Sequence, residues 1–220
     1  MKPYYQVDGI TIYHGDCREV LPQLSTVDLV LTDPPYGINL NTDNSRFSGA
    51  SGHIAKCGNG KGTASGKGIT NDHEPFEPNF LTRIGKNQII WGWNNFPDRL
   101  PRGACLVWLK RYDEAFGLFL SDAETAWMSK GHGVYCRRDL SNNSIANERV
   151  HPTQKPLSLM IWCMNFFPEA FIVMDPFMGS GTTLRAAKDL GRKAIGIEIE
   201  ERYCEIAAQR LSQGVLDFAG

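Results

Sequence analysis

Residues 170–199 carry the pattern of two strands joined by a glycine turn and a helix, which constrains the fold more than any other part of the sequence. Residues 170–174 and 193–199 are apolar and rich in branched side chains, as buried strands are. A glycine turn at 177–183 leads into a helical stretch at 184–190, which Gly191 ends. Because strands joined by a helix run parallel, the sequence predicts an α/β fold with a largely parallel sheet.

The rest of the chain continues this alternation and is expected to form one domain over residues 1–220. Strands are predicted at 10–14, 27–32, 87–91 and 104–109, and helices at 18–24, 157–167 and 201–211. Helices on both faces would make the sheet doubly wound. Because the pattern at 170–211 ends with a helix, the strand and helix at 10–24 are expected to extend its sheet. Residues 41–72 are rich in glycine and polar side chains and are predicted to be a mobile loop.

The glycine turn has the chemistry of a nucleotide-binding site. The glycines of Gly179-Ser180-Gly181 allow a ligand to approach the backbone closely, and the following helix offers free N–H groups. Glu198 lies about 20 residues further on, at the end of the next strand, where an acid can hold both hydroxyls of a ribose. Asp175 before the turn would repel a pyrophosphate but suits an ammonium or sulfonium group. This favours S-adenosylmethionine over NAD; the alternative is a glycine turn used only for packing.

A second motif, Asp33-Pro34-Pro35-Tyr36, follows the predicted strand at 27–32 and offers groups that can bind a planar amine. The Asp33 carboxylate and the Pro34 carbonyl can accept both N–H groups of an amine that is conjugated to an aromatic base. These hydrogen bonds favour tetrahedral nitrogen and free its lone pair for attack. Tyr36 can stack on the base, which contributes about 1–3 kcal/mol toward the cost of flipping the base out of a duplex. The alternative is an ordinary turn between a strand and a loop.

The order of these motifs resembles that of the amino-methylating DNA methyltransferases of the permuted group called beta, with D-P-P-Y first and F-x-G-x-G last. His151-Pro152-Thr153-Gln154-Lys155-Pro156 matches the H-P-T-x-K-P signature of that group, and Gly15-Asp16-Cys17 is similar to its G-D-C. The resemblance covers residues 14–36 and 151–211. It implies a circularly permuted, doubly wound sheet of seven strands. Four carboxylates are expected at the carboxyl ends of strands, where ligands bind in open α/β sheets: Asp16, Asp33, Asp175 and Glu198.

The resemblance also implies the residues of the site. The catalytic residues are expected to be Asp33, Pro34, Pro35 and Tyr36. Residues from all four motifs are expected to contact S-adenosylmethionine, the implied cofactor: Asp16, Asp33, His151, Thr153, Lys155, Asp175, Phe177, Gly179, Ser180, Gly181, Thr182 and Glu198. Basic residues of the glycine-rich loop and of the middle of the chain are expected to bind DNA: Arg46, Lys56, Lys61, Arg99, Arg102, Lys110, Arg111, Arg137 and Arg138.

The predicted activity is transfer of a methyl group from S-adenosylmethionine to an exocyclic amino group of a flipped-out base in DNA. Within the resemblance, an Asp at the first motif position points to adenine N6, and cytosine N4 is the nearest alternative. Methylation of RNA or of a protein amide is a second alternative, although the glycine motif usually comes first in those families. A non-catalytic nucleic-acid-binding protein is a third. Residues 110–150 are a short candidate DNA-recognition insert, which predicts a short or degenerate site, or help from a second subunit in a homodimer.

Composition excludes other broad classes. Apolar residues make up 42% and charged residues 21% of the chain, and the net charge is −1, which is ordinary for a globular protein. No stretch approaches the roughly 20 apolar residues of a membrane span, and the first residues lack the apolar core of a signal peptide. The six cysteines are scattered without a C-x-x-C pair, so reduced thiols and no bound metal are expected. We therefore expect a cytoplasmic protein that binds no metal and no membrane.

Overall fold

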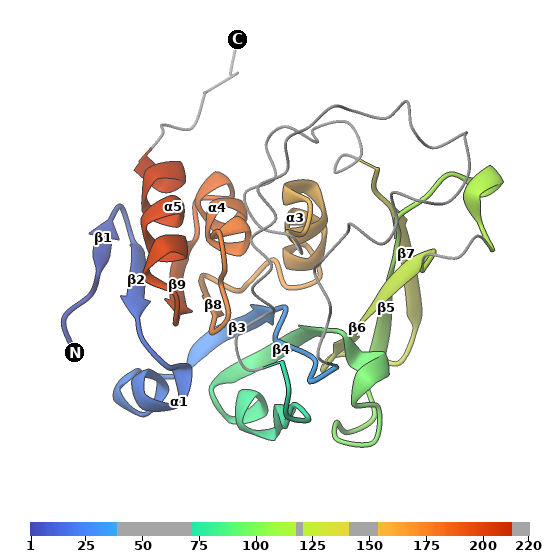
Figure 1. Cartoon of the computed structure of the whole chain (residues 1–220), viewed down its shortest axis with the longest axis horizontal. Helices are drawn as coiled ribbons and strands as arrows, with labels where there is room; N and C mark the ends of the chain where they lie inside the picture. The colour runs from blue at the N-terminus through green and yellow to red at the C-terminus, as the bar shows by residue number, and fades with distance from the viewer. Residues whose placement is uncertain (39–71, 118–120, 141–153, 213–220) are drawn as a thin grey trace, which may run out of the picture.

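The computed structural model describes residues 1–38, 72–117, 121–140 and 154–212. In this described part of the chain, one mixed sheet runs through the centre of the molecule in the strand order β1-β2-β9-β8-β3-β4-β6-β5-β7 (Figure 1). The predicted loop at 41–72 lies outside the described residues except for Asp72. The bounds of the strands are β1 Tyr5–Val7, β2 Ile10–His14, β3 Val27–Thr32, β4 Gly85–Trp91, β5 Ala104–Leu109, β6 Ala123–Met128, β7 Val134–Arg138, β8 Ile172–Asp175 and β9 Lys193–Glu198.

The middle of the sheet is parallel, as the sequence predicted. β2, β9, β8, β3 and β4 all run in the same direction. β6 runs antiparallel between β4 and β5, so β5 points the same way as β4, and β7 is parallel to β5. The carboxyl ends of all these parallel strands therefore lie on one side, which we call the carboxyl edge of the sheet. The opposite side is the amino edge.

The sheet has nine strands in the described residues, whereas the resemblance implied seven and the sequence pattern placed six. One additional strand is β1, because Asp8-Gly9 forms a two-residue turn with φ angles of 51° and 80° that pairs β1 with β2 as a hairpin. The others are β6 and β7. The side chains of β7 are mostly exposed, so its sequence lacks the alternation that marks a strand. β6 and β7 both fall within 110–150, so part of the predicted recognition insert belongs to the sheet.

The N-terminal strand extends the C-terminal unit, as predicted. β2 pairs in parallel with β9, and His14 lies opposite Glu198. α5 (Glu201–Ser212) follows β9 and packs against both strands. The predicted carboxylates consequently meet at the carboxyl edge: Asp16 follows β2, Asp33 follows β3, Asp175 ends β8 and Glu198 ends β9.

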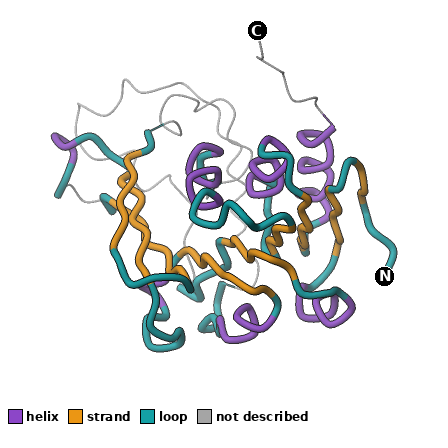
Figure 2. The backbone as a smooth tube through the Cα atoms, turned by 180° about the vertical axis from the view of Figure 1, so that it is seen from behind, coloured by secondary structure: helices purple, strands orange, loops and turns teal. Residues whose placement is uncertain are grey.

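Helices cover both faces of the sheet, so the doubly wound arrangement is confirmed. α3 (Leu157–Met164), α4 (Thr182–Asp189) and α5 lie on one face, and α1 (Cys17–Val20) lies on the other (Figures 1 and 2). α1 is shorter than the predicted helix at 18–24 because Pro22 interrupts it, and the chain continues in the 3-10 segment η1 (Leu21–Gln23). The other 3-10 segments in the described residues are η3 (Pro78–Arg83), η4 (Trp93–Asn95) and η5 (Asp113–Ala115). None of the described helices is long and apolar enough to cross a membrane.

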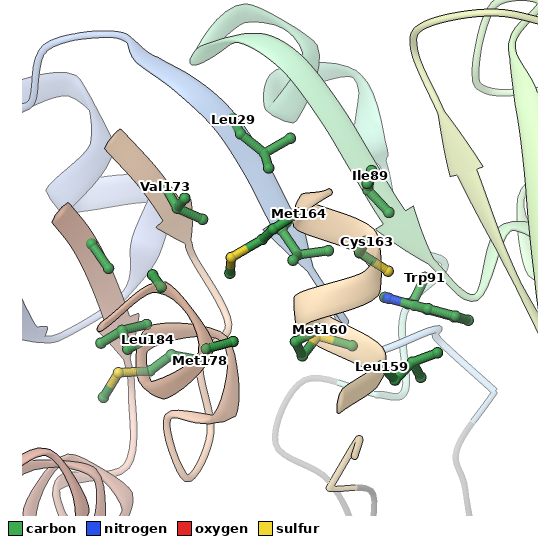
Figure 3. Packing of buried hydrophobic residues seen from close by; sticks show 14 of the residues in the cluster. Leu29, Ile89, Trp91, Leu159, Met160, Cys163, Met164, Val173, Met178 and Leu184 are labelled. Carbon is green, nitrogen blue, oxygen red and sulfur yellow. The ribbon is translucent and has the colours of Figure 1, made fainter. Parts of the chain in front are cut away.

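The main core lies between the sheet and the layer of α3, α4 and α5. Alternate side chains of the central strands point into it, among them Leu29, Ile89 and Trp91 (Figure 3). α3 buries Leu159 and Met164 against these strands. Full burial of one such side chain contributes roughly 1.5–3 kcal/mol. Because α3 is fixed in this way, the residues that directly precede it, 154–156, have a defined position relative to β3 and β4.

Candidate active site

The Asp33-Pro34-Pro35-Tyr36 segment leaves β3 at the carboxyl edge and turns back on itself. The Tyr36 hydroxyl donates a hydrogen bond to Asp33 Oδ1. The Tyr36 ring lies directly over Gly92, the residue after β4, which has a φ of +78°. A Cβ atom at Gly92 would lie 2.0 Å from Tyr36 Cε1, so only glycine leaves room for the ring. Gly92 therefore determines where the Tyr36 ring lies.

A second contact holds the far side of the same turn. The buried Asp72 carboxylate accepts hydrogen bonds from the Gly37 N–H at 2.7 Å and the Ile38 N–H at 3.3 Å. Gly37 lies so close to the following segment that a Cβ atom there would be 2.3 Å from the Glu74 carbonyl oxygen. The turn that carries Asp33 and Tyr36 is consequently packed on both sides.

Lys155, from the segment before α3, reaches this turn from the other layer. Its side chain is only 6% exposed. Its ammonium lies 2.5 Å from Asp33 Oδ2 and 2.8 Å from Glu124 Oε2 in β6, and 5.5 Å from the centre of the Trp91 ring. Burial alone would lower the pKa of Lys155, but the carboxylates of Asp33 and Glu124 outweigh it and raise that pKa well above its usual value. Lys155 is therefore a buried cation between two acids.

Glu124 completes this network, and no sequence motif indicated it. Its second oxygen, Oε1, lies 3.0 Å from Lys110 Nζ, directly after β5. Burial would raise the pKa of Glu124, but the ammonium groups of Lys155 and Lys110 outweigh that effect and lower it to about 2. Burial, together with the Asp33 charge, raises the pKa of Tyr36 well above 10, so its hydroxyl stays protonated and able to donate. Two lysines and two acids thus alternate beside Tyr36.

The glycine turn follows β8 and leads into α4, two residues earlier than the predicted helix start. Gly179 and Gly181 have φ angles of 50° and 80°, and Gly181 is the N-cap of α4. A Cβ atom at Gly181 would lie 2.8 Å from the Ala207 Cβ in α5. Both glycines therefore suit the backbone conformation of the turn, and Gly181 also allows the close packing of α4 on α5.

Two of the predicted carboxylates support the backbone around this turn. Glu198 accepts hydrogen bonds from the Gly179 N–H and the Glu200 N–H, both at 2.9 Å, and burial raises its pKa. Asp16, at the end of the neighbouring strand, caps α1 through the Arg18 N–H at 2.9 Å and pairs with the Arg18 guanidinium. Glu198 contacts the glycine turn directly, Asp16 lies at the end of the strand next to β9, and each acid holds a backbone segment in place.

Asp175 lies underneath the glycine turn rather than at its surface, since the residue is only 3% exposed. Its Oδ1 atom accepts hydrogen bonds from the Thr32 hydroxyl at 2.7 Å and from the Phe177 N–H at 3.1 Å. Burial raises the pKa of Asp175 to about 6, despite these hydrogen bonds. The sequence interpretation had this acid facing a cationic ligand. Its buried position instead joins the glycine turn to Thr32, the last residue before Asp33.

The remaining predicted cofactor residues divide into two sets. Ser180 is buried, accepts hydrogen bonds from Arg210 and contacts Gln154 at 3.3 Å, which connects the glycine turn to the segment that carries Lys155. Thr182 is buried at the start of α4. The Phe177 ring packs against the Phe76 ring, with the two ring centres 5.6 Å apart. His151 and Thr153 lie outside the described residues.

The sequence profile of the DNA methylase family, which groups N6 and N4 methyltransferases, matches residues 59–209. The chain belongs to this family. YubD of Escherichia coli (strain K12), which carries the name of a methylase, is 29% identical over 222 residues, or 90% of this chain and 88% of YubD. The type II methyltransferase M2.DpnII of Streptococcus pneumoniae is 25% identical over 257 residues, or 96% of this chain and 92% of that protein.

Solved methyltransferase structures share the fold. The cytosine-N4-specific PvuII DNA methyltransferase superposes with a TM-score of 0.61 at 18% identity, covering 98% of this chain and 91% of that one. TTHA0409 of Thermus thermophilus, solved in complex with S-adenosyl-L-methionine, gives a TM-score of 0.58 at 21% identity, covering 94% of this chain and 95% of that one. The family assignment and the fold therefore agree with the resemblance of the motifs.

The basic residues that were predicted to bind DNA lie in different parts of this methylase. Lys110 belongs to the ion-pair network of the site, at the carboxyl edge. Arg111 is near the same edge, where its guanidinium lies 3.9 Å from Asp122 and donates to the Ala115 carbonyl. Arg137 and Arg138 end β7 and form ion pairs with Asp139 and Asp113. The predicted DNA-binding residues outside the described part of the chain are Arg46, Lys56 and Lys61.

Two predicted DNA-binding residues are placed elsewhere in the methylase. Arg102 precedes β5 and so lies toward the amino edge, away from Asp33, because β5 runs in the same direction as β4. The Arg99 guanidinium donates to the Phe76 carbonyl, among the aromatic side chains that pack behind Tyr36. Arg102 is therefore not brought together with the candidate active site, and Arg99 has a structural partner.

Proposed function

We propose that this methylase transfers the methyl group of S-adenosylmethionine to the exocyclic amino group of a base in DNA, most specifically adenine N6. The observation that carries the proposal is the 2.7 Å hydrogen bond between Thr32 and Asp175. It joins the end of the strand that presents Asp33 to the start of the glycine turn, on the adjacent strand β8. An amine-binding turn and a cofactor-binding turn would thus lie side by side at one edge.

The residues of the first turn fit an amine acceptor site. The Asp33 carboxylate is held by Tyr36 and Lys155, one on each oxygen, and each oxygen keeps a second lone pair for an amine N–H. With the Pro34 carbonyl as the second acceptor of an amine N–H, the nitrogen lone pair would be directed at the methyl group. The remaining contribution to the rate would come from positioning the amine in line with the methyl carbon. The nitrogen forms its bond to the methyl carbon as the carbon–sulfur bond breaks, and the methylated nitrogen then loses one proton to water. No covalent intermediate with the protein is needed.

The second turn fits the methyl donor. Gly179 and Gly181 have positive φ angles at the N-terminus of α4, where a helix offers backbone N–H groups to a ligand. Glu198 and Asp16 lie on the two neighbouring strand ends, in position for a ribose and an adenine. The bound cofactor would supply a methyl group on a sulfonium centre. Because Glu198 and Asp16 both lie on the β9 side of the turn, the site suits a donor that carries no phosphates.

The finer points of the proposal rest on the motifs. The order of D-P-P-Y before F-x-G-x-G supports the permuted beta group, and the pairing of β2 with β9 supports a circularly permuted sheet. The Asp at position 33 supports adenine N6 over cytosine N4. Because 110–150 is short and also contributes β6 and β7 to the sheet, less chain is available for reading DNA, which supports a short or degenerate recognition site or a homodimer.

Base-resolution mapping of methylated positions tests the proposal directly. Unmethylated genomic DNA is incubated with the protein and S-adenosylmethionine, and N6-methyladenine and N4-methylcytosine are mapped separately, with RNA and protein substrates in parallel. We expect N6-methyladenine at a short sequence. Asp33→Ala is expected to abolish transfer while equilibrium binding of the cofactor persists. Near-normal turnover by Asp33→Ala, or transfer to RNA or protein alone, would refute the proposed function, and one long, strict site would refute the expected mode of recognition.

A further inference from the structure

The Asp33 carboxylate does not stand alone in the site, because a buried lysine holds it. Lys155 lies directly before α3, whose burial against β3 and β4 fixes the position of this segment (Figure 3). Its ammonium contacts Asp33 Oδ2 at 2.5 Å, while the Tyr36 hydroxyl donates to Oδ1. A carboxylate that is held at both oxygens cannot rotate about its Cβ–Cγ bond without breaking one of these contacts.

Glu124 is the second partner of the same ammonium, at 2.8 Å. It projects from the start of β6, the antiparallel strand between β4 and β5, and its other oxygen lies 3.0 Å from Lys110 Nζ. The network therefore runs Lys110, Glu124, Lys155, Asp33 and Tyr36, with cations and acids in alternation. Three elements of the sheet and the segment before α3 contribute to it.

The alternation has a physical consequence for Lys155. A buried cation with a single counter-ion would be pulled wholly toward that partner, and it would lose its compensation whenever the partner engaged another group. Glu124 supplies a permanent counter-ion, so Asp33 can exchange contacts with an incoming amine while Lys155 stays paired. Lys110 in turn keeps Glu124 from being drawn away from β6 by Lys155.

We propose that Lys155 and Glu124 are positioning residues of the methyl-transfer site: Glu124 fixes the Lys155 ammonium, and Lys155 fixes the orientation of the Asp33 carboxylate that accepts the target amine. The inference rests on the proposed function. It also reassigns Lys155, because the motif resemblance implied that this residue contacts the cofactor. The geometry points to Asp33 instead.

A double-mutant cycle with two separate readouts tests this. The variants are Lys155→Met, Glu124→Gln and the combination of both, and the readouts are kcat at saturating DNA and cofactor, and the Kd for S-adenosylmethionine without DNA. We expect Lys155→Met to lower kcat by about tenfold or more and to change Kd by less than about threefold. Glu124→Gln should lower kcat by about threefold or more when Lys155 is present, and have no further effect in the combined variant. The combined variant removes the buried ammonium together with one of its counter-ions, so the net charge of the network does not change and this variant is the one expected to fold most readily.

Lys130→Met is the matched control, because it removes the same charge from an exposed ion pair with Glu169. It should leave kcat and Kd unchanged. A rise of about tenfold in Kd for Lys155→Met, with kcat retained, would place Lys155 on the cofactor and overturn the inference. If kcat of the combined variant fell by the product of the two single effects, Glu124 and Lys155 would act independently. That result would overturn the inference that Glu124 acts through Lys155. Neither result touches the proposed function, which fails only if the wild-type protein itself methylates no amino group in DNA.

A crystal structure of Glu124→Gln gives a readout that does not depend on activity. We expect the Lys155 ammonium to shift toward Asp33 and the carboxylate to leave its wild-type orientation. An Asp33 side chain in an unchanged position, with Lys155 still 2.5 Å from Oδ2, would contradict the proposed role of Glu124 even if the wild-type protein proved inactive on DNA.

Discussion

Substitution of Gly92 by alanine tests whether the position of Tyr36 matters for methyl transfer. Gly92 has a φ of +78°, and an added Cβ atom would lie 2.0 Å, 2.4 Å and 2.5 Å from three atoms of the Tyr36 ring. Ordinary van der Waals contact begins at 3.4 Å, so the ring would have to move by about 1.4 Å, the difference between 3.4 Å and 2.0 Å. Such a shift would also break the hydrogen bond from the Tyr36 hydroxyl to Asp33.

Two separable energies follow from this geometry. A non-glycine residue at positive φ costs roughly 1–2 kcal/mol, and forcing an extra carbon into a packed site typically costs about 1–3 kcal/mol more. We therefore expect Gly92→Ala to lower the free energy of unfolding by about 2–5 kcal/mol, and the Tm by about 2–4 °C for each kcal/mol in a domain of this size. A misplacement of about 1 Å at a reacting group can cost about 100-fold in rate, so kcat should fall about 100-fold, equivalent to about 2.7 kcal/mol.

Gly117→Ala is the matched control. Gly117 has a φ of +76°, and an added Cβ atom there would meet nothing within 4 Å. This variant should show the backbone cost of roughly 1–2 kcal/mol and no change in kcat. Urea unfolding measures the free energy of unfolding. Incorporation of labelled methyl groups into DNA at saturating cofactor measures kcat. If Gly92→Ala kept kcat within about threefold of Gly117→Ala, the reasoning that links Gly92, Tyr36 and the transfer step would be refuted.

Two further substitutions probe the turns of the site. Burial raises the pKa of Asp175 to about 6, so its stabilising contribution is present below about pH 4 and is lost as the pH rises through about 6. Over that range, the wild type should lose about 3 kcal/mol of stability relative to Asp175→Asn, and a difference in unfolding free energy that did not vary with pH would contradict this. Gly181→Ala would place a methyl group 2.8 Å from the Ala207 Cβ, so the cofactor affinity measured by calorimetry should fall by about tenfold. Gly191→Ala is the control, because its added Cβ meets nothing within 4 Å, and it should leave that affinity unchanged. Equal affinities for the two variants would rule out the expected effect of α4 packing.

The parts of the fold that could be predicted are those in which neighbouring residues carry the signal. The stretch from β8 to β9 was predicted because apolar strands, two glycines and a helix follow one another within 170–199, so the pattern can be recognised without knowledge of distant contacts. The Asp8-Gly9 hairpin was missed although its two-residue turn is a strong local signal. β7 could not be predicted in the same way, since its mostly exposed side chains form no alternating pattern.

The partners within the site could not be predicted from local patterns. Asp33 and Lys155 are separated by 122 positions in the sequence, and Glu124 lies in a segment without a recognisable motif. They meet because β6 inserts antiparallel between β4 and β5, and because α3 packs against β3 and β4. The same strand order places Arg102, a predicted DNA-binding residue, toward the amino edge and away from the candidate active site.

The sequence by itself determined which chemical groups this methylase possesses, and that both motif turns follow buried strands. These properties depend on residue type and spacing along a few neighbouring positions. Only the tertiary structure decided that Asp175 is a buried link to Thr32, that Gly92 fixes the ring of Tyr36, and that Lys155 is shared by Asp33 and Glu124. Strand order and helix packing bring these atoms within contact distance, and neither is encoded in any one stretch of the chain.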